Sequence, residues 1–215
     1  MNKIFVTGIG TAVGKTIVSA ILTEALNADY WKPIQTGADE DSDAETVRNL
    51  VSNPHSRFHP ECYLFAAPLS PHIAAQKENK TIELSNLKSK ISQLKSKCLI
   101  IEGAGGVMVP LNKTNRIIDL ILALEARPVI VSRHYLGSIN HTLLTFDTLV
   151  SRGIKPLGIV YNGLDNYGAE EYIQDYTNLS VLGRINQELE LTKDVVKRYA
   201  AEMKGSLETA LPKGI

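Results

Sequence analysis

Short apolar runs alternate with longer amphipathic segments along this chain. Continuous apolar runs suit parallel strands buried on both faces, whereas apolar residues that recur every three or four positions indicate helices. The pattern predicts strands at residues 3–7, 29–32, 98–102, 128–131, 155–161 and 179–182. It predicts helices at residues 17–26, 44–51, 84–94, 116–125, 142–152 and 189–203, with another passing through Tyr172.

Strands that alternate with helices are typically joined by right-handed crossovers. We therefore expect an α/β fold in which a mostly parallel sheet is flanked by helices, as a three-layer sandwich. The length of 215 residues suits one domain with a substantial core, so residues 1–215 are expected to form a single domain. Residues 52–71 lack a clear period, and we interpret them as a loop that is a candidate lid or pocket wall.

The first strand ends in the glycine-rich turn Gly-Ile-Gly-Thr-Ala-Val-Gly-Lys-Thr, residues 8–16. Glycines let the backbone turn tightly, so N–H groups can face an anion, and the helix that follows adds its positive end. Lys15 is placed to reach the β- and γ-phosphates of a nucleotide, and the Thr16 hydroxyl is placed to bind Mg²⁺. Five residues rather than four separate Gly8 from Gly14, so the pattern predicts a variant phosphate loop and a P-loop NTPase-like fold.

Two other interpretations of this turn exist. A dinucleotide-binding fingerprint requires G-x-G-x-x-G, and the spacing of Gly8, Gly10 and Gly14 has one residue too many. A nicotinamide site also has no use for Lys15 and Thr16. A purely structural turn is the second alternative, but reversing a chain does not require a lysine and a threonine. We favour a nucleoside-triphosphate site.

Charged residues stand at the carboxyl ends of two other predicted strands, the edge where ligands gather in open α/β sheets. Lys32 comes just before Pro33, which ends the second strand. Glu102 precedes a run of glycine and alanine, and an acid there is placed to hold or orient a metal ion. An exposed acid without such a role is the alternative for Glu102. Ser42 or Asp43 is expected to cap the helix that follows.

Composition narrows the class of partner. Lys+Arg and Asp+Glu both total 23, so no global basic field favours nucleic acid or an anionic membrane. Cys62 and Cys98 belong to no Cys-x-x-Cys pair and predict neither a disulfide framework nor a zinc site. The first apolar run breaks at Gly8, too early for a signal peptide, and no run is long enough to span a membrane. We expect a cytoplasmic protein that binds small molecules, without nucleic-acid or membrane partners.

Six segments together resemble the dethiobiotin synthetase family, whose members use ATP to close the ureido ring in biotin synthesis. They are Val-Gly-Lys-Thr at 13–16, Trp-Lys-Pro-Ile-Gln-Thr-Gly at 31–37, Ser-Asp-Ala at 42–44, Leu-Ser-Pro-His at 69–72, Glu-Gly-Ala-Gly-Gly at 102–106 and Leu-Gly-Ser-Ile-Asn-His at 136–141. The resemblance spans nearly the whole chain, and it is specific because of the order and spacing of the segments. It implies a carbon–nitrogen ligase that acts on 7,8-diaminopelargonic acid, CO₂ and Mg-ATP.

The resemblance also implies roles for individual residues. The nucleotide would be bound by Gly10, Thr11, Ala12, Val13, Gly14, Lys15 and Thr16, with Asn162 at the adenine edge. Thr16, Asp43 and Glu102 would form the Mg²⁺ environment, and Lys15, Lys32 and Thr36 would be catalytic. Thr11 and Gly105 would line the diamine site together with Lys32 and Thr36. Leu136, Gly137, Ser138 and Asn140 would receive the substrate carboxylate from the neighbouring subunit, which implies a homodimer.

Some positions leave alternatives open. Family members often carry Thr-Asp where Ile9-Gly10 stands and an acid where Ala12 stands, so a substrate contact from that acid is absent here. Many also carry proline at the position of Asn186, which leaves the nucleotide base selectivity open. Capping of the following helix is the alternative role for Ser138 and Asn140. We interpret His72 and His141 as structural residues rather than general bases.

A nucleotide-switch or partitioning ATPase with a similar variant loop is the second functional hypothesis. Such proteins commonly carry a further lysine within the loop, where this chain has Gly10. Lys32 on the second strand favours the synthetase instead, because it supplies the added positive charge from outside the loop.

Overall fold

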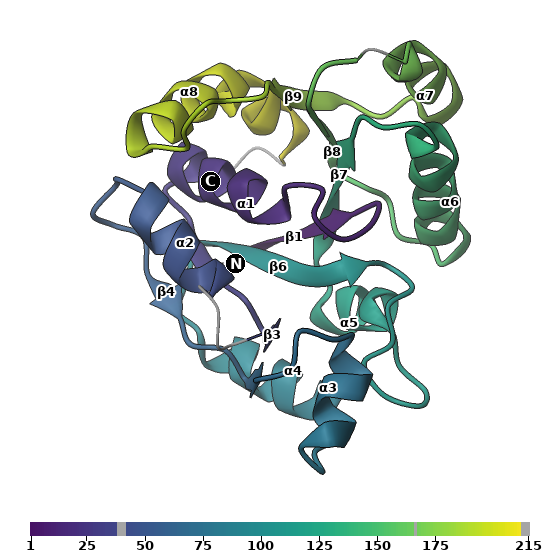
Figure 1. Ribbon diagram of the computed structural model, residues 1–215. Coiled ribbons are helices and arrows are strands. Elements are labelled where there is room, and N and C mark those ends of the chain that lie inside the picture. Colours follow the sequence, from purple (N-terminus) through teal and green to yellow (C-terminus); the bar gives the residue numbers. More distant parts are fainter. Residues whose placement is uncertain (38–41, 166, 212–215) are drawn as a thin grey trace.

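A seven-stranded sheet forms the centre of the computed structural model, which describes residues 1–37, 42–165 and 167–211 (Figure 1). The strand order is β4-β2-β6-β1-β7-β8-β9, and every pairing is parallel. The strands are β1 (Asn2–Gly8), β2 (Asp29–Trp31), β4 (Phe58–His59), β6 (Cys98–Gly106), β7 (Arg127–Arg133), β8 (Gly158–Asn162) and β9 (Val181–Ile185). The predicted parallel sheet is confirmed.

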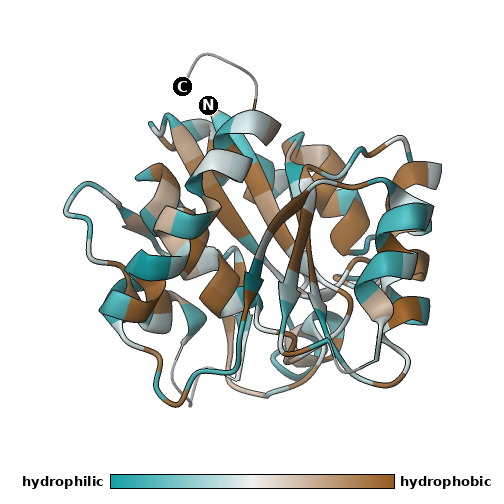
Figure 2. Cartoon of the chain, turned by 90° about the horizontal axis from the view of Figure 1, so that it is seen from above, coloured by the Kyte–Doolittle hydropathy of each residue, from teal (hydrophilic) through white to brown (hydrophobic). Residues whose placement is uncertain are grey.

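Helices cover both faces of this sheet (Figure 1). One layer consists of α1 (Lys15–Leu26), α2 (Asp43–Leu50) and α8 (Lys193–Ala210), which pack against one another. The other layer contains α4 (Leu84–Gln93), α5 (Ile117–Leu124) and α6 (Ser138–Ser151), with α7 (Ala169–Thr177) beside α6. Figure 2 shows that the central strands are mainly hydrophobic, as expected for strands covered on both sides. The three-layer α/β sandwich is therefore confirmed.

Four short elements are not predicted by the hydrophobic period. Strand β3 (Ile34–Thr36) pairs in parallel with β5 (Tyr63–Phe65) in a separate two-stranded sheet, and α3 covers Pro71–Lys77. The interpretation of residues 52–71 as loop throughout is therefore wrong, since β4 and β5 lie within them. Strands of two or three residues are too short for a period to be recognised.

Several element boundaries also differ from the prediction. The glycines after Glu102 continue β6 to Gly106, so Glu102 lies inside the strand and is 1% exposed. The interpretation of Glu102 as an exposed acid is therefore wrong. Helix α8 begins and ends later than predicted, at Lys193 and Ala210, and β9 is displaced to residues 181–185.

The two capping predictions have opposite outcomes. Ser42 caps α2 as predicted, because its hydroxyl accepts the Glu45 N–H at 3.1 Å. Helix α6 begins at Ser138 rather than at Thr142, and its N-cap residue is Gly137. The capping role considered for Ser138 and Asn140 is therefore wrong.

Across residues 1–37, 42–165 and 167–211, no helix combines the length and the apolar character needed to cross a membrane.

Candidate active site

The phosphate loop connects the carboxyl end of β1 to the first residue of α1 (Figure 1). A Cβ atom on Gly8 would lie 2.5 Å from Val13 Cγ2, so the tight return of the loop requires glycine there. Gly14 has a φ of +95°, a conformation that also favours glycine. The buried Lys15 ammonium donates to the Gly10 carbonyl at 3.0 Å. The lysine side chain therefore reaches back across the phosphate loop.

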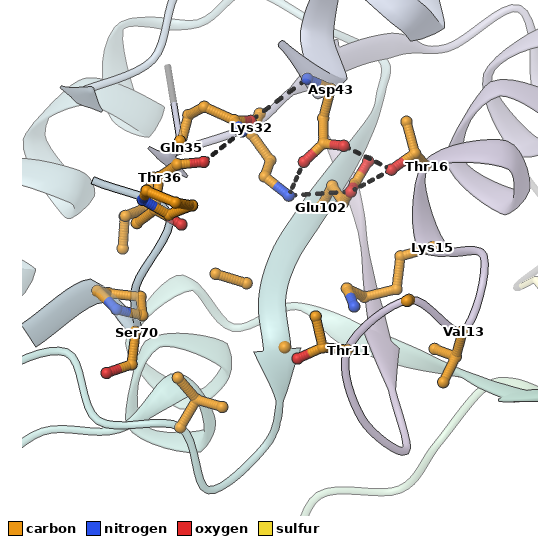
Figure 3. Close-up of a pocket in the computed structure, with 18 of the residues that line it drawn as sticks. Thr11, Val13, Lys15, Thr16, Lys32, Gln35, Thr36, Asp43, Ser70 and Glu102 are labelled. Atoms are coloured by element: carbon orange, nitrogen blue, oxygen red, sulfur yellow. Dashed lines mark hydrogen bonds and ion pairs between the residues drawn. The ribbon is translucent and has the colours of Figure 1, made fainter. Parts of the chain in front are cut away.

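Four predicted residues form one network at the sheet edge (Figure 3). The Lys32 ammonium lies 2.6 Å from Asp43 Oδ2 and 2.9 Å from Glu102 Oε1. Thr16 Oγ1 lies 2.7 Å from Asp43 Oδ1 and 3.0 Å from Glu102 Oε1. The structure thus brings together side chains from the start of α1, the residue that follows β2, the start of α2 and the middle of β6.

Burial and charge act against each other in this network. Burial alone would lower the pKa of Lys32, but the Glu102 and Asp43 carboxylates outweigh it and raise that pKa. Burial would raise the pKa of Asp43, but Lys32 and the Thr16 hydroxyl hold it below its usual value. Burial and then the Lys32 charge lower the pKa of Lys15 to about 8, and the Glu102 and Asp43 charges, which act in the opposite direction, do not outweigh them.

Tyr30 is a member of the site that the sequence analysis does not identify. Its hydroxyl donates to Glu102 Oε2 at 2.8 Å, and both side chains are buried. Strands β2 and β6 are paired, with Tyr30 opposite Ile100. A tyrosine within an apolar run is normally interpreted as a core residue, so no local sequence signal distinguishes a site tyrosine from a core tyrosine. The bond leaves Glu102 Oε1 to face Lys32 and Thr16.

A cavity of about 710 Å³ opens beside this network, within the size range typical of small-molecule sites. Its lining includes these predicted residues: Thr11, Ala12, Val13, Gly14, Lys15, Thr16, Lys32, Thr36, Asp43, Glu102 and Gly105. Gln35 and Ser70 also line it and were not predicted (Figure 3). Residues 68–71 form part of the wall, so the predicted pocket-wall role holds for this end of segment 52–71.

Other predicted residues lie outside this cavity. Gly10 lines a separate hollow of about 350 Å³ on another side of the loop. The Asn162 amide donates to the Val13 carbonyl at 2.9 Å, against the loop.

The predicted carboxylate-binding segment does not line the cavity either. Leu136 is 86% exposed, Gly137 and Asn140 are exposed, and Ser138 is buried. This chain alone therefore does not bring residues 136–140 to the cavity. Nearby, His141 Nδ1 is 2.7 Å from the Tyr135 hydroxyl, which agrees with its interpretation as a structural residue.

The donor set suits a hard divalent cation. Thr16, Asp43 and Glu102 offer a hydroxyl and two carboxylates that already converge, and oxygen ligands are those that Mg²⁺ prefers. Among the residues that the structure describes, no group of three or more His, Cys, Asp or Glu side chains is placed to hold a metal. A cation held by the hydroxyl and the two carboxylates would take its remaining ligands from water or phosphate oxygens, as Mg²⁺ commonly does.

Solved structures place the fold in a known class. The chain is similar to MinD in the MinC:MinD cell division protein complex of Aquifex aeolicus, with a TM-score of 0.64, 13% identity and coverage of 100% of this chain and 98% of that one. It is also similar to the septum site-determining protein MinD complexed with Mg-ADP from Pyrococcus horikoshii, with a TM-score of 0.58, 18% identity and coverage of 98% and 93%. Such likeness concerns the fold alone. Fold and loop define a protein of the P-loop NTPase class.

Sequence comparisons define the family more narrowly. A family model described as an AAA domain matches residues 2–195. The chain is 47% identical to the ATP-dependent dethiobiotin synthetase BioD of Cytophaga hutchinsonii, over 94% of this chain and 97% of that protein. It is 48% identical to that of Christiangramia forsetii, over 94% and 96%. The chain therefore belongs to the family of ATP-dependent dethiobiotin synthetases, and the resemblance found in the sequence is confirmed.

Proposed function

We propose that this protein is an ATP-dependent dethiobiotin synthetase, a ligase that forms dethiobiotin, ADP and phosphate from 7,8-diaminopelargonic acid, CO₂ and ATP. One structural observation is the main support for this proposal. Two buried lysines and a set of hard oxygen ligands, drawn from four separate elements, meet at one wall of the 710 Å³ cavity. Relatives 45–48% identical along most of the chain are ATP-dependent dethiobiotin synthetases.

The reaction needs no covalent nucleophile from the protein. One substrate amine attacks CO₂ and forms a carbamate, and a carbamate oxygen then attacks the γ-phosphorus of ATP, with ADP as the leaving group. The second amine attacks the carbonyl carbon of the resulting mixed anhydride and expels phosphate, which closes the ureido ring. The protein contributes positioning and charge stabilisation.

The residues of the cavity suit these tasks. Lys15 lies at the loop and provides positive charge to the β- and γ-phosphates, and Lys32 provides it to the carbamate and the transferred phosphoryl group. Thr16, Asp43 and Glu102 would hold Mg²⁺, which when bound neutralises phosphate charge. Thr36, Thr11 and Gly105 line the part of the cavity assigned to the diamine.

Two nucleotide contacts are proposed from outside the cavity wall. Asn162 would read the adenine edge through its Oδ1, because its Nδ2 donates to Val13. Gly10 would act on the nucleotide through Lys15, since its carbonyl accepts a hydrogen bond from the Lys15 ammonium.

We also propose a homodimer, because residues 136–140 do not line the cavity of their own subunit. Leu136, Leu144, Tyr172 and Tyr176 are all more than half exposed, and they lie at the start of α6, on α6 and on its neighbour α7. A second copy would cover these apolar side chains and place its own residues 136–140 against the substrate carboxylate. Light scattering of the purified protein tests this, and a monomer at micromolar concentration would contradict it. We further propose a cytoplasmic location.

The function is tested by incubating the purified protein with Mg-ATP, bicarbonate and 7,8-diaminopelargonic acid. Mass spectrometry should detect the ureido product, formed in equal amount to ADP. ATP hydrolysis that the diamine does not stimulate, without a ureido product, would refute the proposal and favour the switch ATPase. Fold similarity to MinD does not by itself favour that alternative, since it comes with identities of 13–18%.

A further inference from the structure

Side chains hold the carbonyl groups of the phosphate loop at three positions. Lys15 donates to Gly10, as described above. Arg133 Nη1 donates to the Ala12 carbonyl at 3.1 Å, and the Asn162 amide donates to the Val13 carbonyl at 2.9 Å. Arg133 is the last residue of β7, Asn162 is the last residue of β8, and the two are register partners. Side chains at the ends of two adjacent strands therefore donate hydrogen bonds to two successive carbonyl groups of the loop.

These bonds determine where the amide groups of the loop point. In a trans peptide the carbonyl of one residue and the N–H of the next point in opposite directions, and the described residues contain no cis peptide. A carbonyl of Ala12 held toward Arg133 directs the Val13 N–H away from Arg133. The Gly14 N–H is likewise directed away from Asn162. N–H groups aligned in this way are what a phosphate loop offers to its anion.

Ala12 needs such support more than the other loop residues do. Its φ is +55°, in the left-handed region that an alanine rarely adopts. The hydrogen bond from Arg133 falls on the carbonyl of this same residue. Arg133 lines the 350 Å³ hollow and does not line the 710 Å³ cavity, so it reaches the loop from the side away from the lysines and carboxylates.

We propose that Arg133 is a positioning residue of the nucleotide site. It acts through the loop: by holding the Ala12 carbonyl, it keeps the Val13 N–H turned toward the phosphates. The inference rests on the proposed function only in taking ATP as the ligand of the loop.

The test compares Arg133→Met with a matched control on the same strand. Arg127, at the opposite end of β7, also donates a guanidinium hydrogen bond to a carbonyl, that of Ala210 at 3.2 Å. Affinity for Mg-ADP is measured by isothermal titration calorimetry on the full chain, and KM is measured for ATP and for the diamine. Loss of one hydrogen bond corresponds to a rise in Kd of about fivefold.

We expect that rise, with a matching rise in KM for ATP, for Arg133→Met only. The KM for the diamine and the melting temperature should stay unchanged, and Arg133→Lys should recover part of the affinity because lysine still offers a donor. The lower affinity of Arg133→Met for Mg-ADP should persist at about 0.5 M NaCl, where long-range charge effects are screened.

Equal affinities for Arg133→Met, Arg127→Met and the unaltered protein would overturn the inference, and so would a loss that disappears in high salt. A lack of nucleotide binding by the unaltered protein would instead overturn the proposed function.

Discussion

Replacing Lys32 by methionine should destabilise the protein even before any effect on turnover is considered. The change removes the positive charge between Asp43 and Glu102 and keeps the length of the side chain. The Glu102 side chain is 0% exposed, so its carboxylate would remain buried without a cation. The Asp43 side chain is 30% exposed, so solvation of its carboxylate compensates most of the free energy lost with the ion pair to Lys32.

The magnitude follows from what Glu102 keeps. Removing one partner of a buried ion pair typically costs about 3–5 kcal/mol. Glu102 would retain the Tyr30 hydroxyl at 2.8 Å and the Thr16 hydroxyl at 3.0 Å, which places the expected loss near the lower end of that range, at about 3 kcal/mol. That loss is a large part of a typical total stability of about 5–15 kcal/mol.

Urea denaturation in Mg²⁺-free buffer at neutral pH measures this loss. The double variant Lys32→Met with Glu102→Gln should recover most of the lost stability, because it removes the buried charge. Lys80→Met is the matched control, since Lys80 pairs with Glu78 at 2.8 Å on the surface and its loss should leave the unfolding midpoint unchanged. A loss for Lys32→Met below about 1 kcal/mol, or a double variant no more stable than the single one, would refute this reasoning.

Three further changes test other parts of the site. Burial lowers the pKa of Lys15 to about 8, so kcat/KM for ATP should fall as the pH rises through that value; a flat profile to pH 9 would contradict this. The same shift lowers the free energy of unfolding below pH 8, where Lys15 is charged in the folded protein. The free energy of unfolding should rise as the pH increases from 8 toward 10.5, which a pH series of urea unfolding can follow. Tyr30→Phe leaves Glu102 Oε2 without its donor and should cost about 2 kcal/mol in urea unfolding, whereas an unchanged midpoint would contradict the bond. Gly14→Ala sets a Cβ against the Asn162 amide at positive φ and should abolish ADP binding in calorimetry, and retained affinity would contradict the loop geometry.

The candidate nucleotide site could be predicted from the sequence because its signals are local. The glycine spacing and the Lys-Thr pair that define the phosphate loop lie within nine consecutive residues, 8–16. Lys32 and Glu102 could be placed at the same sheet edge because both lie at or near the carboxyl ends of predicted strands, and parallel strands end on one side. Apolar periods likewise identified the long strands and helices, although not their ends.

Contacts between residues far apart in the chain were decided only by the tertiary structure. Tyr30 and Glu102 are separated by 72 residues, and Arg133 and Ala12 by 121, so no local pattern connects them. Strand register brings Tyr30 to the carboxylate, and the pairing of β7 with β8 brings Arg133 and Asn162 to successive loop carbonyls. Such bonds depend on which strands are neighbours and at what register. The sequence therefore determined the candidate site residues, and packing decided which side chains hold them in place.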